Sequence, residues 1–278
     1  MATDCAIASE WSMEMVRFSV ITVTYNAGNK LKETVTDVLR QTYNNYELLV
    51  KDGLSKDDSL SQLPVSDKIR VESCKDAGIY DAMNQAVSMA QGDYIIFMNC
   101  GDYFYDENVL GRLAEAIEAH PGCGIYYGDA YFRLSKEVLH MPGEITDFVC
   151  FRHIPCHQAC IFARELWVEQ GFDLNYKIRA DYEFFLRQYC QKKAKPFYTG
   201  IVVADYEGGG YSESKENRKR DKREHRQICG KYMPKGKLFL YRFIMFITLQ
   251  PLRFWIAQRS PLAGVYDRLK TKIYRTGK

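Results

Sequence analysis

Residues 18–24 read Phe-Ser-Val-Ile-Thr-Val-Thr, and this stretch decides the fold class. It is short, largely apolar and rich in β-branched residues, as expected of a strand that is buried on both faces of a sheet. Residues 25–28, Tyr-Asn-Ala-Gly, interrupt the pattern, and Leu31, Val35 and Val38 then recur at the spacing of an amphipathic helix. A buried strand, a turn and a helix form the first unit of an α/β fold.

The alternation of strands and helices continues through residue 117. Apolar runs predict strands at 46–50, 69–71 and 94–98, and apolar stripes predict helices at 79–90 and 109–117. Such a chain forms a mostly parallel sheet flanked by helices. Ligands of these sheets bind beyond the carboxyl ends of the strands, where this sequence has Asn26, Asp52 and Asp102. The topology alone therefore predicts a site at that edge.

The second half of the chain is less periodic. Its pattern predicts strands at 125–134, 159–162 and 201–204, a helix at 181–189 and a glycine turn at 208–210.

The overall composition, with 46% hydrophobic and 26% charged residues, excludes a disordered chain and a multi-span membrane protein. The net charge of +3 conceals an asymmetry, because residues 215–278 hold 18 basic and 4 acidic residues and the remainder has a net charge of −11. The charge distribution indicates an acidic body with a basic tail of +14.

The nine cysteines are odd in number and lack the spacing of a disulfide framework. The first 17 residues contain neither a basic segment nor the apolar stretch of a signal peptide. We therefore predict free thiols and a cytoplasmic location.

Two motifs suggest other chemistry but fit it poorly. His153, Cys156, His157 and Cys160 are residue types that bind zinc, yet their spacing matches no closed site, and buried thiols are the alternative. The glycines at 122–128 imitate a dinucleotide fingerprint but follow a helix instead of a strand. No phosphate-binding loop of the G-x-x-x-x-G-K-[ST] type exists in the chain, which argues against P-loop nucleotide hydrolysis.

An ordered series of short motifs covers residues 17–215. The motifs lie at 20–26 (Val-Ile-Thr-Val-Thr-Tyr-Asn), 50–55 with 57–59, 76–84 (Asp-Ala-Gly-Ile-Tyr-Asp-Ala-Met-Asn), 92–102, 157–158, 171–173, 180–182 and 208–212. In this order they resemble the family 2 glycosyltransferases of the GT-A fold, and most closely bacterial surface-polysaccharide enzymes of the colanic-acid type. The resemblance implies a Rossmann-like α/β domain that binds a nucleotide-sugar.

The resemblance also implies roles for individual residues. Asp52 matches the aspartate that pairs with the nucleotide base, and the segment Thr24, Tyr25 and Asn26 matches the loop beside the same nucleoside. Asp76 and Asn84 match positions near the nucleotide and the sugar. Asp102 matches the metal ligand of the D-x-D-type motif, and Asp181 matches the catalytic base. Gly101 departs from the family, which often has an aspartate there, so ribose contact at this position is lost or is made by backbone.

The chemistry of these residue types agrees with the resemblance. Sugar transfer from a nucleoside diphosphate needs neutralisation of the leaving diphosphate and deprotonation of an acceptor hydroxyl. Asp102 with Mg²⁺ or Mn²⁺ would supply the first, and Asp181 the second. From the spacing alone, Asp102 and Asp52 could instead be turn or helix N-cap aspartates, and Asp181 could cap the helix that follows it. One base and no enzyme nucleophile suit a single displacement with inversion. His157 would contact the diphosphate, the metal or the acceptor, or would be an ordinary loop histidine.

The sequence predicts three parts: an N-terminal extension at 1–16, a catalytic domain at 17–214 and a basic tail at 215–278. The catalytic domain divides into a nucleotide-sugar half at 17–105 and an acceptor half at 106–214. The tail combines a basic run with an apolar segment at 238–257 that contains arginine and proline, which disfavours a spanning helix. We predict an interfacial helix on an anionic membrane, the cytoplasmic face of the inner membrane, with a helix packed on the catalytic domain as the alternative.

The predicted partners are a nucleotide-sugar, most simply a UDP-sugar, and a glycan or lipid-linked acceptor of surface-polysaccharide synthesis. No nucleic-acid recognition fold accompanies the basic run, so we predict no nucleic-acid partner, and the oligomeric state stays open. Two other functions remain at this stage: a catalytically silent sugar-nucleotide-binding or scaffold protein, which Gly101 keeps open, and a nucleotidyltransferase, which would need a first loop richer in glycine than residues 25–28.

Overall fold

The computed structural model describes residues 15–208 and 217–247, and a nine-stranded sheet runs through this part of the chain. Its first four strands are parallel. β1 (Phe18–Thr24) lies between β2 (Tyr46–Asp52) and β4 (Tyr94–Phe97), and β3 (Ile69–Ser73) forms the outer edge beside β2. The carboxyl ends of β1 and β2 therefore meet, since Thr24 stands opposite Asp52 in the register.

The second half extends the same sheet with mixed strand directions. β8 (Cys160–Ala163) joins the two halves, because it pairs antiparallel with both β4 and β6 (Ile125–Phe132). β9 (Pro196–Tyr206) runs parallel to β6. The short strands β5 (Tyr103–Phe104) and β7 (Glu137–Leu139) pair antiparallel with β9 and β6.

Helices cover both faces of the sheet because the strands are apolar on both sides. α1 (Asn29–Leu39) and α3 (Val109–Ala119) bury their stripes with Val20 in one core. α2 (Ile79–Met89) and α5 (Ala180–Leu186) pack with Ile21 in the other. Adjacent residues of β1 thus enter opposite cores, as the pleat of a strand requires.

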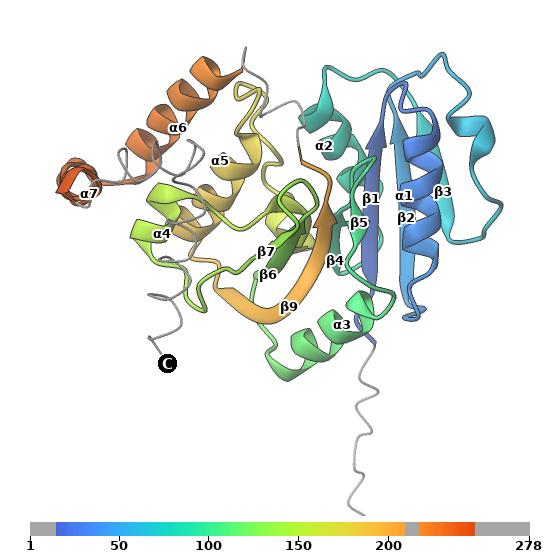
Figure 1. Cartoon of the computed structure of the whole chain (residues 1–278), viewed down its shortest axis with the longest axis horizontal. Helices are drawn as coiled ribbons and strands as arrows, with labels where there is room; N and C mark the ends of the chain where they lie inside the picture. The colour runs from blue at the N-terminus through green and yellow to red at the C-terminus, as the bar shows by residue number, and fades with distance from the viewer. Residues whose placement is uncertain (1–14, 209–216, 248–278) are drawn as a thin grey trace, which may run out of the picture.

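Three further helices lie at the end of the molecule remote from β3 (Figure 1). They are α4 (Asp147–Arg152), α6 (Arg218–Tyr232) and α7 (Lys235–Ile247). Short turns complete the elements: η1 (Leu60–Gln62), η2 (His157–Ala159), η3 (Arg164–Trp167) and the π-helical η4 (Arg187–Gln191). Ile228 of α6 and Leu238 of α7 are buried in the core that contains α5, so both helices pack on the domain.

The predicted α/β fold is confirmed, and the predicted strands and helices of the first half lie within a few residues of the observed ones. The pattern missed β5 in the first half and β7 and α4 in the second, and it found only residues 201–204 of β9. The predicted helix at 181–189 is α5 followed by the π turn. Residues 248–257 of the predicted apolar segment and residues 209–210 of the predicted turn lie outside the described residues.

Candidate active site at the carboxyl edge of the sheet

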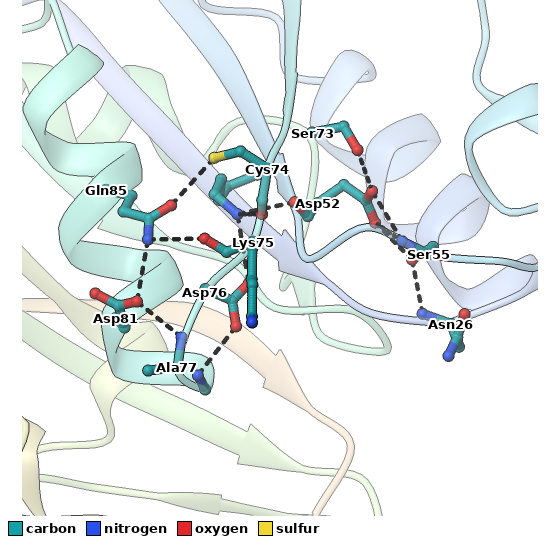
Figure 2. A network of polar contacts seen from close by, with 12 residues as sticks. Asn26, Asp52, Ser55, Ser73, Cys74, Lys75, Asp76, Ala77, Asp81 and Gln85 are labelled. Carbon is teal, nitrogen blue, oxygen red and sulfur yellow. Dashed lines mark hydrogen bonds and ion pairs between the residues drawn. The ribbon is translucent and has the colours of Figure 1, made fainter.

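Asp52, at the end of β2, organises the loop that follows it. Its carboxylate accepts hydrogen bonds from the hydroxyl groups of Ser55 and Ser73, and from the backbone N–H of Ser55 (Figure 2). Burial acts to raise the pKa of Asp52, but these hydrogen bonds outweigh it and the pKa lies below its ordinary value. The Ser55 hydroxyl also accepts from the backbone N–H of Asn26, so Asp52 and Asn26 belong to one network.

Residues 24–26 line the same edge with three different side chains. Tyr25 is exposed, and the Oγ1 atom of Thr24 is buried with no hydrogen-bond partner among the described residues. Asn26 has a φ of 50°, a left-handed conformation that asparagine tolerates better than most residues, and its Oδ1 accepts from the backbone N–H of Lys56. The segment is therefore a hydrogen-bonded turn with the exposed ring of Tyr25.

Asp76 faces this turn from the β3–α2 loop. A Cβ atom on Gly53 would lie 2.7 Å from its Oδ2 and 3.3 Å from the ring of Tyr25, so glycine allows the three residues to gather. The carboxylate accepts from the backbone N–H of Gly78 and lies 3.4 Å from Nζ of Lys51.

Lys51 is a contributor that the sequence analysis missed. Its side chain is fully buried, and Nζ donates to the carbonyl oxygens of Asp52 and Cys74, at 2.8 and 2.7 Å. A buried ammonium is stable only when it is paired and hydrogen-bonded, and here it ties the ends of β2 and β3 to Asp76. A lysine directly after the apolar run Leu48–Val50 was the available signal.

The side chain of Asn84 is occupied by contacts within the protein. Its side-chain amide donates to the carbonyl oxygen of Phe172 and accepts from the N–H of the same residue, at 3.0 and 2.8 Å. It therefore joins α2 to the loop before α5, and a contact with the sugar stays a prediction.

Asp102 lies at the end of the β4–β5 loop and is 5% exposed. Its carboxylate accepts from Nε2 of Gln158 at 2.8 Å and from the backbone N–H of Glu207 at 3.0 Å. Burial, with the nearby Glu207 carboxylate adding to it, raises the pKa of Asp102 to about 6. Asp102 thus has two charged neighbours of opposite sign, the Glu207 carboxylate and the Arg133 guanidinium, and the second acts to lower its pKa.

Asp181, in the first turn of α5, is held by a residue of the opposite half. The Tyr80 hydroxyl lies 3.0 Å from Oδ1 of Asp181 and 2.7 Å from the carbonyl oxygen of Ile178. Burial and the Asp181 charge hold the pKa of Tyr80 well above its ordinary value, so Tyr80 is a hydrogen-bond donor. Tyr80 lies within the motif at residues 76–84, but no sequence pattern links it to Asp181.

His157 and Gln158 form one turn that connects the two carboxylates. Gln158 donates to Asp102, whereas His157 stacks on Phe97 and lies close enough to Asp181 that the charge counters the fall of its pKa caused by burial. The pKa of His157 still lies below its ordinary value, so the ring is neutral at pH 7. The structure thus brings Asp102, His157 and Asp181 to one region.

Three buried polar atoms in this region lack a partner among the described residues: Oγ1 of Thr24, Oδ1 of Asn99 and Nε2 of His157. Buried polar atoms are nearly always hydrogen-bonded in folded proteins, and groups that are not point to an absent ligand or water. The three atoms come from the ends of β1 and β4 and from η2, so they mark the edge that the topology predicted.

Asp102 could bind a divalent cation with few other ligands from the protein. Within the residues that the structure describes, no three side chains of the metal-binding types converge. A cation here would take most of its ligands from a diphosphate and water, as Mg²⁺ commonly does at phosphate-transfer sites. The same observation leaves the zinc alternative without support, and burial raises the pKa of Cys156 to about 12 and that of Cys160 well above its ordinary value, which keeps both as thiols.

Comparison with known proteins identifies the class of the site. Residues 19–166 match the family described as "Glycosyl transferase family 2". A "PGL/p-HBAD biosynthesis glycosyltransferase" of Mycobacterium bovis is 31% identical over 205 residues, which cover 71% of this chain and 79% of the relative. An uncharacterized glycosyltransferase of Mycobacterium tuberculosis is 30% identical over 71% of this chain and 78% of its own.

Solved structures show the same fold at lower sequence identity. A mannosyltransferase from Pyrobaculum calidifontis, in complex with GDP-Man and Mn²⁺, has a TM-score of 0.61 at 18% identity and covers 95% of this chain and 83% of its own. TarS of S. aureus (residues 1–349), in complex with UDP-GlcNAc, has a TM-score of 0.59 at 18% identity, and the match spans 74% of this chain but only 64% of TarS 1–349. Together, the family match over residues 19–166 and the mycobacterial relatives establish that the chain belongs to glycosyl transferase family 2.

Proposed function

We propose that this glycosyltransferase inverts the anomeric configuration of a sugar as it moves the sugar from a nucleoside diphosphate to a hydroxyl group of a glycan or lipid-linked acceptor. The observation that carries the proposal is the turn His157–Gln158. Gln158 donates to Asp102 at 2.8 Å, and His157 is near enough to Asp181 for the carboxylate charge to act on its ring. A sugar held between the two carboxylates would have its leaving group on one side and its acceptor on the other.

The bond changes follow from this arrangement. Asp181 takes the proton of the acceptor hydroxyl, and the oxygen forms a bond to the anomeric carbon from the face opposite the diphosphate. The bond from the anomeric carbon to the phosphate oxygen breaks, and the diphosphate leaves with the electron pair. Tyr80 fixes the direction of the Asp181 carboxylate, because its hydroxyl donates to one of the two oxygens.

Asp102 would hold Mg²⁺ or Mn²⁺, with Gln158 and the N–H of Glu207 orienting its carboxylate. The bound cation would neutralise negative charge on the departing diphosphate. Neutral His157 can donate one hydrogen bond to a phosphate or acceptor oxygen from its unpartnered Nε2.

The nucleoside would lie over residues 24–26, between Tyr25 and Asp76. Asp52, which is fully buried, would shape this site through Ser55, and its contact with the base is part of the proposal. The complexes of structural neighbours with UDP-GlcNAc and with GDP-Man support a nucleotide-sugar donor, and we propose a UDP-sugar.

The C-terminal helices support attachment to an anionic membrane surface. Phe239, Phe243 and Phe246 of α7 are each at least half exposed, whereas Leu238 and Tyr241 pack on the domain. Basic side chains of the preceding helix α6 are also exposed, at positions 218–220, 222, 223 and 226. We propose that this surface binds the cytoplasmic face of the inner membrane, where a lipid-linked acceptor of surface-polysaccharide synthesis would lie. No helix within residues 15–208 and 217–247 is long and apolar enough to cross a bilayer.

Incubation with a panel of UDP- and GDP-sugars, with and without Mn²⁺, tests the proposal. We expect a UDP-sugar to be hydrolysed slowly alone and transferred when an acceptor is added, with NMR showing the opposite anomer in the product. A product that retains the donor configuration would overturn the mechanism. Condensation of a nucleoside triphosphate with a sugar phosphate would overturn the reaction class.

A further inference from the structure

The space that a side chain at position 101 would need is already filled by Glu207. A Cβ atom built on Gly101 would lie 2.5 Å from Oε2 of Glu207, and Gly101 has a φ of +97°, which other residues rarely adopt. The carboxylate of Glu207, which directly follows β9, therefore occupies the space beside Gly101, the residue before Asp102.

Two contacts fix Glu207 beside Asp102. Its backbone N–H donates to Oδ1 of Asp102 at 3.0 Å, and its carboxylate oxygens lie 2.6 and 2.7 Å from Nζ of Lys30 in α1. A third residue, Arg133, donates to the carbonyl oxygen of Gly101 and so holds the same loop. Two carboxylates, one ammonium and the Arg133 guanidinium thus meet at the edge of the site.

Asn99, three residues before Asp102, contributes a further oxygen to this loop. Its Oδ1 is buried and has no partner among the described residues, although it belongs to the same loop as Asp102. Carboxylate and amide oxygens are the ligands that hard divalent cations prefer.

We propose that Glu207 supplies the second carboxylate of the metal site, in place of a side chain at position 101, and that Lys30 is the counter-ion that the divalent cation displaces. The inference rests on the proposed role of Asp102. The side chains of Lys30 and Glu207 are 52% and 37% exposed, so their ion pair contributes little stability and can open at little cost. The incoming cation replaces the positive charge that Lys30 withdraws.

A plain structural clamp between α1 and β9 is the competing explanation of the same pair. The two explanations predict different changes in cation affinity when Lys30 is lost. A clamp predicts that loss of either partner has the same effect on the metal site. Displacement predicts that loss of Glu207 weakens cation binding, whereas loss of Lys30 strengthens it.

The experiment measures the affinity of the full chain for Mn²⁺, with saturating UDP and no sugar. The EPR signal of free Mn²⁺ shows whether each variant binds the cation more weakly or more tightly. We expect Glu207→Gln to weaken binding by about 10-fold or more, on the scale seen when groups supporting a metal are removed. We expect Lys30→Met to tighten it several-fold. Glu207→Asp keeps the charge but withdraws it by one methylene, so it should bind between wild type and Glu207→Gln.

Matched variants separate this effect from general changes of charge. Glu33→Gln and Lys32→Met alter charges of the same sign on the same helix and should leave Mn²⁺ binding unchanged. Weaker binding in both Glu207→Gln and Lys30→Met, or no change in Glu207→Gln, would overturn the inference. Unchanged binding in Asp102→Asn would instead overturn the metal site of the proposed function.

Discussion

Asp181 is the residue whose replacement separates chemistry from binding. Asp181→Asn keeps the shape and the Tyr80 contact but cannot accept the proton of the acceptor hydroxyl. We expect kcat to fall about 10²–10⁴-fold, the usual contribution of a general base. The dissociation constant of the donor, measured by calorimetry, should stay within error of wild type, since in the proposed mechanism the carboxylate contacts only the acceptor. Loss of donor binding in this variant would make Asp181 a structural residue.

Tyr80 should act through Asp181 rather than on a substrate. Tyr80→Phe removes the hydroxyl that donates to Oδ1 and leaves the ring against Phe172. We expect a fall of kcat smaller than in Asp181→Asn, with an unchanged KM for the donor. The double variant should be no slower than Asp181→Asn alone, because both changes affect one function. Additive losses in steady-state assays would show that Tyr80 has a separate role.

Asp52 gives the protein a defined dependence of stability on pH. The pKa of its folded state is below the ordinary value, so its hydrogen bonds add stability above the unfolded pKa of about 3.9, and this stability is lost as pH falls through the folded pKa. Asp52→Asn should lower the free energy of unfolding by about 1–3 kcal/mol at pH 7. Urea titrations should show the difference from wild type disappearing as pH falls below the folded pKa, and a constant difference would contradict this.

At the scale of elements, α5 depends on α6 for the position of its first turn. The buried carboxylate of Glu224 accepts from the backbone N–H groups of three successive residues, 177–179, which lead into α5. Asp181 follows two residues later. The helix that carries Asp181, the proposed base, is thus held by a segment predicted from the sequence to be the tail, and the boundary at 214–215 stays a prediction.

Glu224→Gln tests this dependence. The amide nitrogen that replaces one oxygen cannot accept, so at least one buried N–H loses its partner, and we expect a loss of about 1–3 kcal/mol in the free energy of unfolding. Transfer activity should fall at temperatures where the variant is still folded. Asp221→Asn, which removes only a partly exposed ion pair with Arg179, is the control and should cost about 0–1 kcal/mol.

The elements of the first half could be predicted because each is regular and local. β1, α1, β2 and α2 carry their own periodicity, and the parallel topology then fixes which ends meet. Glu207 and Tyr80 could not be predicted in the same way. Glu207 lies 105 residues from Asp102 and Tyr80 lies 101 residues from Asp181, and no local pattern encodes contacts over such separations.

At the scale of the whole molecule, the exposed face of α7 is expected to decide where the protein is found. Replacement of Phe239, Phe243 and Phe246 by Gln should abolish co-sedimentation with anionic vesicles and leave the melting temperature unchanged, since these side chains are exposed. The basic residues contribute about 1 kcal/mol each near such a surface, so high salt should weaken binding of the wild type.

A double variant, Val65→Gln with Val168→Gln, is the matched control, because it removes exposed apolar side chains elsewhere. It should bind vesicles like wild type. Full-length protein that stays in the supernatant with anionic vesicles at low salt would exclude the membrane role.

The contact of Glu224 with residues 177–179 also affects the order in which parts of the site can form during synthesis of the chain. Translation reaches Glu224 43 residues after Asp181, which takes about 2–9 s at typical elongation rates. The strands and helices that would bind the nucleotide, β1 to β4, leave the ribosome earlier. We therefore expect a nascent chain to be able to hold a nucleotide before Asp181, the proposed base, is in position, so that a chain stalled before α6 would bind donor without consuming it.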